Sequence, residues 1–289
     1  MTGKSKNKNS RSKKGVSPAI STVIITAITI ALVTVAVVFA NNFLSARMAE
    51  SDFNAAKQSM QTIGLQIDDV AWKIGQRETI RYSSKYGSIS VLNATLNYKI
   101  EVKTTGPSYV LFSQNSTGTV FFNMPNSQYT ISNNWYALIW PSQIANITLK
   151  GSSAPTAKVF GIEKIPMSDG NFIRVVTAPM IRVINSTIVT GSNSTFYFKF
   201  YLPLVSLKSA PRLSQSVTLT GNSISMKTQN KITSIRITVS FPQTAAGFDN
   251  SFFHFPTSLQ EVINAPSGYN DCVLEFYMGT VSTELGAHG

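Results

Sequence analysis

A long apolar segment near the N-terminus is the feature that most restricts how this chain can fold. No Asp, Glu, Lys or Arg occurs between Val16 and Ala40, a stretch of about 25 residues. As a helix rising about 1.5 Å per residue it is about 37 Å long, and the hydrocarbon core of a bilayer is about 30 Å thick. The sequence therefore predicts one membrane-spanning helix.

The residues before this segment form a basic leader without acids. Its cations are Lys4, Lys6, Lys8, Arg11, Lys13 and Lys14. Basic residues beside a span stay on the cytoplasmic side, so we expect a single-pass protein with a cytoplasmic N-terminus and an extracellular C-terminal domain. An ordinary secretory signal has a shorter apolar core that ends in a small-residue cleavage site. Here a glycine, Gly15, precedes the apolar segment instead.

The run from Lys13 to Ile20 reads Lys-Lys-Gly-Val-Ser-Pro-Ala-Ile and resembles the class III signal peptide of type IV pilin-like proteins. Its Val-Ser-Pro start resembles the archaeal members of that family. The resemblance covers about residues 11–45. It implies cleavage by a prepilin peptidase between Gly15 and Val16, which removes residues 1–15. Many bacterial relatives have Glu at the fifth mature position, where this chain, like many archaeal relatives, has isoleucine.

A plain signal anchor is the alternative interpretation of the same segment. It also has a basic tail and an apolar span, and Gly15 would then be incidental. The Lys-Lys-Gly-Val-Ser-Pro run favours the pilin-like interpretation. The two interpretations differ in whether the leader is cut from the native protein.

Small and hydroxyl side chains recur along the apolar segment. Thr22, Thr26 and Thr29 follow the spacing i, i+4, i+7, and Ala27 and Ala31 form a small-xxx-small pair. Residues of this kind allow membrane helices to approach one another closely, so we predict that this face packs against other helices. A threonine in such a helix also bonds back to its own carbonyls, which is the alternative that needs no neighbouring helix.

The helical pattern continues beyond the membrane segment. Apolar residues recur there at spacings of mostly 3, 4 and 7, namely Phe53, Ala56, Met60, Ile63, Ile67, Val70 and Ala71. This spacing is typical of an amphipathic helix. Since no proline follows Pro18 before Gly75, we predict a helix over 16–75 that spans the membrane in its first half. Asn41-Asn42 and Gly64 are the positions where it could break.

From about Arg77 the pattern changes to short strands separated by Gly, Pro, Ser and Asn. We therefore predict an α+β fold, in which the long hydrophobic helix is followed by an antiparallel β-sandwich-like extracellular head over 76–289. We expect the strands to form a core of their own; the alternative is that the upper part of the helix supplies a hydrophobic wall to the sheet, in which case a chain that folds must start near Ala49. The place for a break, if the head has two subdomains, is 151–155. The expected strands include 109–112, 119–122, 135–140, 146–150, 158–163, 195–208, 217–220, 223–227, 235–241 and 273–281, with a short helix or aromatic loop at 247–255.

Residues suited to catalysis or metal binding are scarce. The chain has two histidines, His254 and His288, and one cysteine, Cys272, so an intramolecular disulfide is excluded. No P-loop or GxGxxG motif occurs. We therefore expect no enzyme, no metal and no cofactor, with Cys272 buried in a strand and the pair Asp68-Asp69 facing water.

The net charge of +12 gives little support for nucleic acid as a partner. Six of the cations lie in the leader, and its removal would lower the net charge to about +6. The other cations are scattered along the chain and do not cluster with aromatic residues, so no nucleic-acid binding is expected.

The region after the membrane segment contains five glycosylation sequons, about as many as chance gives in a chain rich in Asn, Ser and Thr. If glycans are attached, we expect loop positions such as Asn115 and Asn193 to carry them rather than strand positions such as Asn93. The five sequon residues are Asn93, Asn115, Asn146, Asn185 and Asn193.

The resemblance implies a pilin or minor pilin, a subunit of an archaeal type IV pilus-like surface filament or secretion assembly that polymerises through its N-terminal helix. Its implied partners are other pilin subunits, a prepilin peptidase, an assembly ATPase, a platform protein and, before assembly, membrane lipid. The alternative is a membrane-anchored extracellular β domain that acts as an adhesin, receptor or solute-binding module. An anchored extracellular enzyme is a third interpretation.

Overall fold

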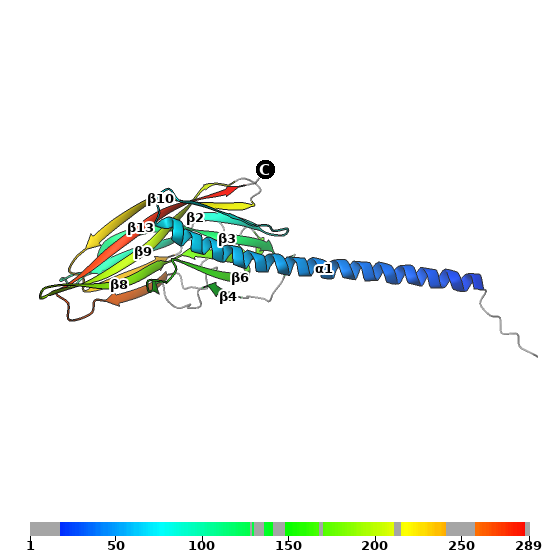
Figure 1. The fold of residues 1–289 in the computed structure, drawn as a ribbon. Helices are drawn as coiled ribbons and strands as arrows, with labels where there is room; N and C mark the ends of the chain where they lie inside the picture. The colour runs from blue at the N-terminus through cyan, green and yellow to red at the C-terminus, as the bar shows by residue number, and fades with distance from the viewer. Residues whose placement is uncertain are drawn as a thin grey trace, which may run out of the picture. The chain divides into compact units, whose positions relative to one another are not determined.

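A computed structural model describes residues 18–127, 129, 136–140, 148–167, 170–210, 215–240 and 258–286. Helix α1 (Pro18–Ala71) comes first, and the strands follow (Figure 1). The chain divides into two compact units, Met1–Arg47 and Met48–Gly289. The boundary falls inside α1, so the second unit, which we call the head unit, includes the last part of the helix.

The strands of the head unit form two sheets. The six-stranded sheet has the order β1 (Arg77–Arg81), β10 (Ser216–Gln229), β13 (Asp271–Gly286), β9 (Asn193–Ser209), β8 (Ile181–Thr190), β5 (Thr148–Lys150). The seven-stranded sheet has the order β12 (Ser258–Asn264), β11 (Ser234–Ser240), β2 (Ser88–Lys103), β3 (Val110–Pro125), β7 (Gly170–Pro179), β6 (Ala157–Met167), β4 (Tyr136–Trp140).

The α+β class is confirmed, since one long apolar helix precedes a sheet-rich domain. The prediction of purely antiparallel pairing is wrong at two places, because β13 pairs with β9 in parallel and β5 pairs with β8 in parallel. Alternation of apolar and polar residues identifies a strand and its buried face. It carries no information on the direction of the neighbouring strand.

Several expected strands have different limits in the structure. The segments expected at 109–112 and 119–122 both belong to β3, which begins one residue later than the first of them, at Val110. Those expected at 217–220 and 223–227 are both within β10, which has an irregularity between Gly221 and Ser223. Strands β1 and β12 did not stand out in the sequence. The segment 247–255 lies outside the described residues.

Two apolar clusters fill the head unit, and both sheets contribute to each. The first, the sheet core, includes Tyr98 and Ile237 from one sheet and Phe200 and Phe276 from the other. The second, the helix core, adds side chains from α1. Strand β3 serves both clusters: Phe121 belongs to the sheet core, and its neighbours Val120 and Phe122 belong to the helix core.

The last part of α1 provides one wall of the helix core. Its buried apolar side chains include all of those that the helical spacing predicted: Phe53, Ala56, Met60, Ile63, Ile67, Val70 and Ala71. The predicted amphipathic stripe is therefore confirmed. The expectation that the strands form a core of their own is wrong for this cluster, because helix side chains fill it.

Two glycines allow the C-terminal end of the helix to lie directly on the six-stranded sheet. A Cβ at Gly221 would lie 2.2 Å from the carbonyl oxygen of Val70, and one at Gly279 would lie 2.2 Å from that of Ala71. The chain after the helix is held there too, since the Gly75 amide donates to the Gly221 carbonyl at 2.8 Å. Side chains at these two positions would push the helix off β10 and β13.

Candidate functional surfaces

The first part of α1, residues 18–47, exposes its apolar side chains. Val23, Phe39 and Leu32 are exposed by 69%, 71% and 65%. Among the described residues α1 is the one helix that is long and apolar enough to cross a membrane. No residue in its most apolar stretch is buried. By length and composition this stretch fits a membrane span or a signal sequence. The predicted cleavage site, Gly15–Val16, lies outside the described residues.

The threonines of the predicted packing face are satisfied within the helix. The Thr22 hydroxyl donates to the Pro18 carbonyl at 2.6 Å, Thr26 to Thr22 at 2.9 Å and Thr29 to Ile25 at 2.8 Å. These bonds match the alternative in which threonine bonds back to its own helix. Ala27 and Ala31 are exposed in the same segment. The hydroxyls therefore need no neighbouring helix, and the small side chains are accessible to one.

Asp52 joins the start of the head unit to the loop between β1 and β2. One of its carboxylate oxygens accepts hydrogen bonds from the Lys85 amide at 2.6 Å, the Tyr86 amide at 3.1 Å and the Ser84 hydroxyl at 3.1 Å. A carboxylate that accepts several backbone amides fixes a loop strongly. Sequence spacing gave no sign of this role, since the partners lie more than 30 residues away.

The neighbouring residues Asp68 and Asp69 differ in their surroundings. Asp68 accepts hydrogen bonds from Trp72 and Thr156, each at 3.0 Å, and pairs with Arg182 at 3.2 Å. The expectation that both face water is therefore wrong for Asp68, which ties α1 to β8. Asp69 is exposed, and its hydrogen bond from Lys73 holds its pKa below the usual range.

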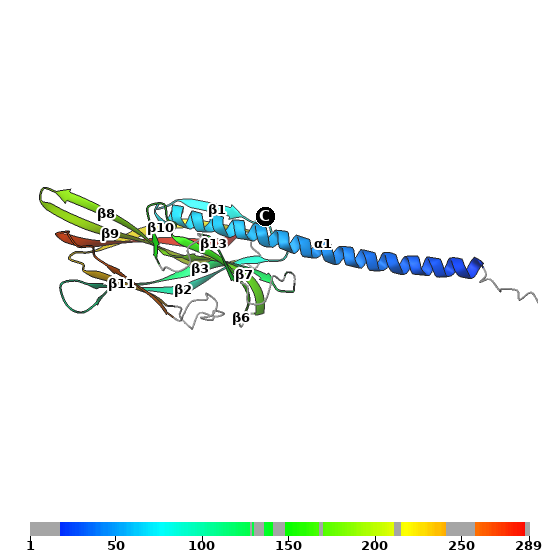
Figure 2. The ribbon, with the colours of Figure 1, turned by 90° about the horizontal axis from the view of Figure 1, so that it is seen from below.

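Four turns lie at one end of the head unit (Figure 2), and we call them the tip loops: 104–109, 190–193, 230–233 and 265–270. Backbone hydrogen bonds link them. The Asn270 amide donates to the Ser194 carbonyl at 2.9 Å, Ala265 to Thr233 at 3.0 Å and Thr233 to Lys103 at 2.8 Å. The tip is therefore one connected structure, although its loops are far apart in the sequence.

Strand β2 shows how far the tip is from the beginning of the head unit. It starts next to the loop that Asp52 holds and ends at Lys103, where the tip loops begin. The strand has 16 residues, which at about 3.3 Å each span about 50 Å. The tip therefore lies at the opposite end of the head unit from Asp52.

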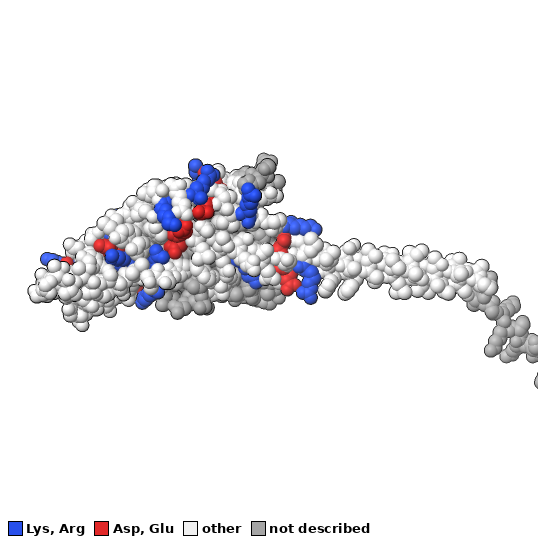
Figure 3. Space-filling model, in the orientation of Figure 1, with Lys and Arg blue, Asp and Glu red and all other residues white. Residues whose placement is uncertain are grey.

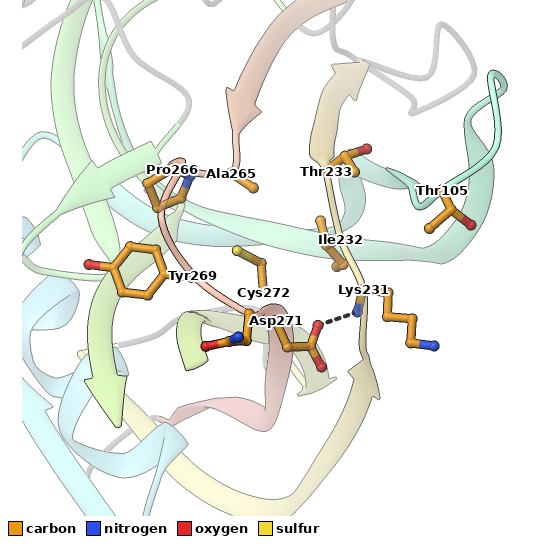
Figure 4. Close-up of a pocket in the computed structure, with 10 residues that line it drawn as sticks. Thr105, Lys231, Ile232, Thr233, Ala265, Pro266, Tyr269, Asp271 and Cys272 are labelled. Carbon is orange, nitrogen blue, oxygen red and sulfur yellow. Dashed lines mark hydrogen bonds between the residues drawn. The ribbon is translucent and has the colours of Figure 1, made fainter. Parts of the chain in front are cut away.

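A cavity of about 520 Å³ lies among the tip loops. Figure 4 shows Tyr269 and Pro266 on one side of it and Thr105 on the other, with Ile232 and Cys272 between them. This volume is within the range of about 300–1,000 Å³ that is usual for small-molecule sites. Sequence reasoning missed this site because no motif joins the loops that form it.

The cavity lining includes one cationic and one anionic residue, Lys231 and Asp271. The Lys231 backbone has φ of 57°, a left-handed conformation that is unusual for a residue with a side chain, and its amide donates to Asp271 at 2.8 Å. Burial, with a smaller contribution from the Asp271 charge, raises the pKa of the Cys272 thiol. The thiol is therefore neutral near pH 7. Cys272 is a buried strand residue, as predicted.

The predicted glycosylation residues lie in different settings. Asn93, Asn185 and Asn193 are exposed, and Asn193 begins β9 at a tip loop. Asn115 lies inside β3 and is half-buried, so its expected loop position is wrong. Asn146 lies outside the described residues.

Comparisons with protein-family models, curated proteins and solved structures find no match to this chain. Within the described residues, no three His, Cys, Asp or Glu side chains gather in a group that could hold a metal ion. The function proposed below therefore rests on the sequence and the geometry of this chain.

Proposed function

We propose that this chain is a pilin or minor pilin, a subunit of an archaeal type IV pilus-like surface filament or secretion assembly. The observation that carries the proposal is the continuity of α1 from Pro18 to Ala71. One uninterrupted helix has an exposed apolar first part and a last part that packs into a folded domain. The Lys-Lys-Gly-Val-Ser-Pro run before it supports processing by a prepilin peptidase.

In this proposal the helix changes its surroundings once the leader is removed. Before cleavage the six leader cations hold the N-terminus at the cytoplasmic face, and the head lies outside as a β-sandwich-like domain. After the cut at Gly15–Val16 the apolar helix leaves the lipid for a bundle of helices from other subunits. The exchange costs little apolar burial, since one apolar environment replaces another. An assembly ATPase and a platform protein drive it.

The native N-terminus tests the processing step. Mass spectrometry of the protein from its own membranes should find Val16 as the first residue. A Gly15→Asp variant should keep the leader, because a charged, larger side chain then replaces the glycine at the cut. Residues 1–15 on most of the native protein would contradict the proposal and favour an uncut anchor.

A double variant tests the packing face. Ala27→Leu with Ala31→Leu keeps the segment apolar, so membrane insertion and cleavage should persist. The added bulk should reduce filament yield strongly, since overpacking costs about 1–3 kcal/mol per site. The matched control is Ile28→Phe with Leu32→Phe, the same i, i+4 spacing, which adds less volume on a face that holds neither the threonines nor the alanines and should leave the yield near normal. Normal filaments from the alanine variant, counted by electron microscopy, would refute the proposal that Ala27 and Ala31 pack against other helices.

The tip cavity favours a second function, that of a permanently anchored extracellular module. Its position about 50 Å along β2 from the Asp52 contact suits a binding site that a membrane anchor displays to the outside. In this case the native protein keeps its leader and forms no filaments. The same two measurements therefore separate the two functions.

A further inference from the structure

We propose that the cavity among the tip loops is a binding site for a neutral carbohydrate. The inference goes beyond the filament proposal and does not depend on it, since it concerns only the described residues of the head unit. It rests on three observations: the charge balance of the tip, the polar groups that the cavity offers, and an aromatic wall beside them.

The composition of the tip loops opposes an ionic ligand. Lys231 is the one charged residue in the four loops, and the others include many hydroxyl and amide side chains. Asp271, at the start of β13, adds one opposite charge to the cavity lining, and the Cys272 thiol is neutral. On the face that Figure 3 shows, charged side chains of both signs are interspersed over the head unit. An anionic ligand would need a surplus of cations.

The polar groups of the cavity match a sugar's hydroxyls, which both donate and accept. Asp271 accepts the Lys231 amide through Oδ1, which leaves Oδ2 as an acceptor. Asn270 accepts from Ser194 through its own Oδ1, at 2.8 Å from the amide, and its Nδ2 remains a donor. The hydroxyl of exposed Thr105 does both. The cavity therefore offers both acceptors and donors to a ligand.

Tyr269 supplies the aromatic wall. Its ring packs against Phe196 with a centroid separation of 5.1 Å, so it is supported from the strand behind it. Pro266 and Ile232 add apolar surface beside it. A sugar ring has an apolar C–H face and a polar rim, so an aromatic face next to a few placed polar groups fits it better than it fits a wholly apolar ligand.

A peptide that binds as an added strand is a less suitable occupant. That mode needs unpaired backbone groups at a sheet edge. Around the cavity, backbone amides of Ile232, Thr233 and Ala265 are already bonded to neighbouring loops or strands. Recognition there falls to side chains, and loops rich in Tyr, Ser, Gly and Asn are the kind that adaptable binding surfaces use.

The test uses the full-length protein in detergent micelles on an array of immobilised glycans, neutral, sialylated and sulfated. We expect binding to at least one neutral glycan, and isothermal titration with the soluble form of that glycan then gives the affinity. Tyr269→Leu and Asp271→Asn should each weaken it about tenfold or more, which corresponds to about 1.4 kcal/mol. Tyr197→Leu, the same change on β9 away from the cavity lining, is the matched control and should bind as the wild type does.

Circular dichroism and thermal unfolding check that each variant is folded. If Asp271→Asn disturbs the loop that Lys231 closes, Thr105→Val provides the second polar test, and at this exposed position it should weaken binding several-fold. Binding restricted to sialylated or sulfated glycans, no binding to any neutral glycan, or unchanged affinity in the folded cavity variants would each overturn the proposal. None of these outcomes bears on the N-terminus or the filament yield.

Discussion

The two parts of α1 belong to one helix, yet they place their apolar side chains in opposite settings. Val33 and Phe39 in the first part are exposed by 56% and 71%, while Met60 and Ile63 in the second part are completely buried. The first part is apolar all round, and the second has an apolar stripe with polar residues beside it. A stripe finds its partner within the chain, but a uniformly apolar surface needs lipid or other helices on every side.

The largest effect is expected between two shortened chains, one that keeps the second part of α1 and one that lacks it. A chain that starts at Met48 should fold, because it keeps the α1 side chains that fill the helix core. One that starts at Arg77 should not, since it exposes that cluster to water. Near-UV circular dichroism and thermal unfolding measure the difference. A cooperative transition in the shorter chain at the same temperature as in the longer one would show that the helix is dispensable.

Single substitutions in the two parts of α1 should differ in their effect on stability. Ile63→Ala should lower the free energy of unfolding of the head unit by about 2–5 kcal/mol, because it leaves a cavity in a filled core. Ile30→Ala, at a site exposed by 62%, should change it by less than about 0.5 kcal/mol. Denaturant unfolding of the full-length protein in detergent, followed by tryptophan fluorescence, gives both values. Equal effects at the two sites would contradict the division of the helix.

The next largest effect on stability should come from the contact between the end of α1 and the six-stranded sheet. Gly279→Ala places a Cβ against the Ala71 carbonyl and should cost about 1–3 kcal/mol of unfolding free energy. Gly106→Ala is the control, since no atom lies within 4 Å of its added Cβ. The denaturant concentration at the unfolding midpoint reports both changes in stability, provided that the slope of the free energy against denaturant concentration is unchanged. A Gly279→Ala variant as stable as the control would mean that the helix end moves freely on β13.

The smallest expected effects distinguish two adjacent carboxylates. Asp68→Asn weakens the contact with Arg182 and should cost about 1–2 kcal/mol. Asp69→Asn should change stability little. The lowered pKa of Asp69 stabilises the fold above its unfolded value near pH 4, and this contribution is lost as the pH falls through the folded pKa. Acid titration of the Asp69→Asn variant should therefore show a slightly weaker loss of stability than the wild type.

Local periodicity predicted the parts of the fold that a single element decides. The buried stripe from Phe53 to Ala71 and the burial of Cys272 both follow from side-chain spacing within one helix or strand. Pairing between distant strands has no such signal, so the parallel contact of β9 with β13 was missed. The role of Asp68 was missed for the same reason, because Arg182 is 114 residues away.

The candidate sites differ in the same way. The exposed apolar helix was evident from composition alone, because one continuous segment forms it. The tip cavity joins loops that are up to about 160 residues apart, such as those at Thr105 and Tyr269. Only the register of the sheets brings these loops to one end of the head unit. The one motif that reaches them, the glycosylation sequon at Asn193, gives no sign of a cavity.

The two glycines under the end of α1 also bear on how the head unit takes up a mechanical load. A pull on the helix reaches the head unit along the buried stripe from Phe53 to Ala71, and the last of these contacts, at Val70 and Ala71, lies on Gly221 and Gly279. Strand β13 lies inside its sheet and is paired along its length with β10 and β9. Tension that passes along these strands shears many hydrogen bonds at once instead of opening them one by one. A tensile load that reaches the sheet through the end of α1 is therefore shared among many hydrogen bonds.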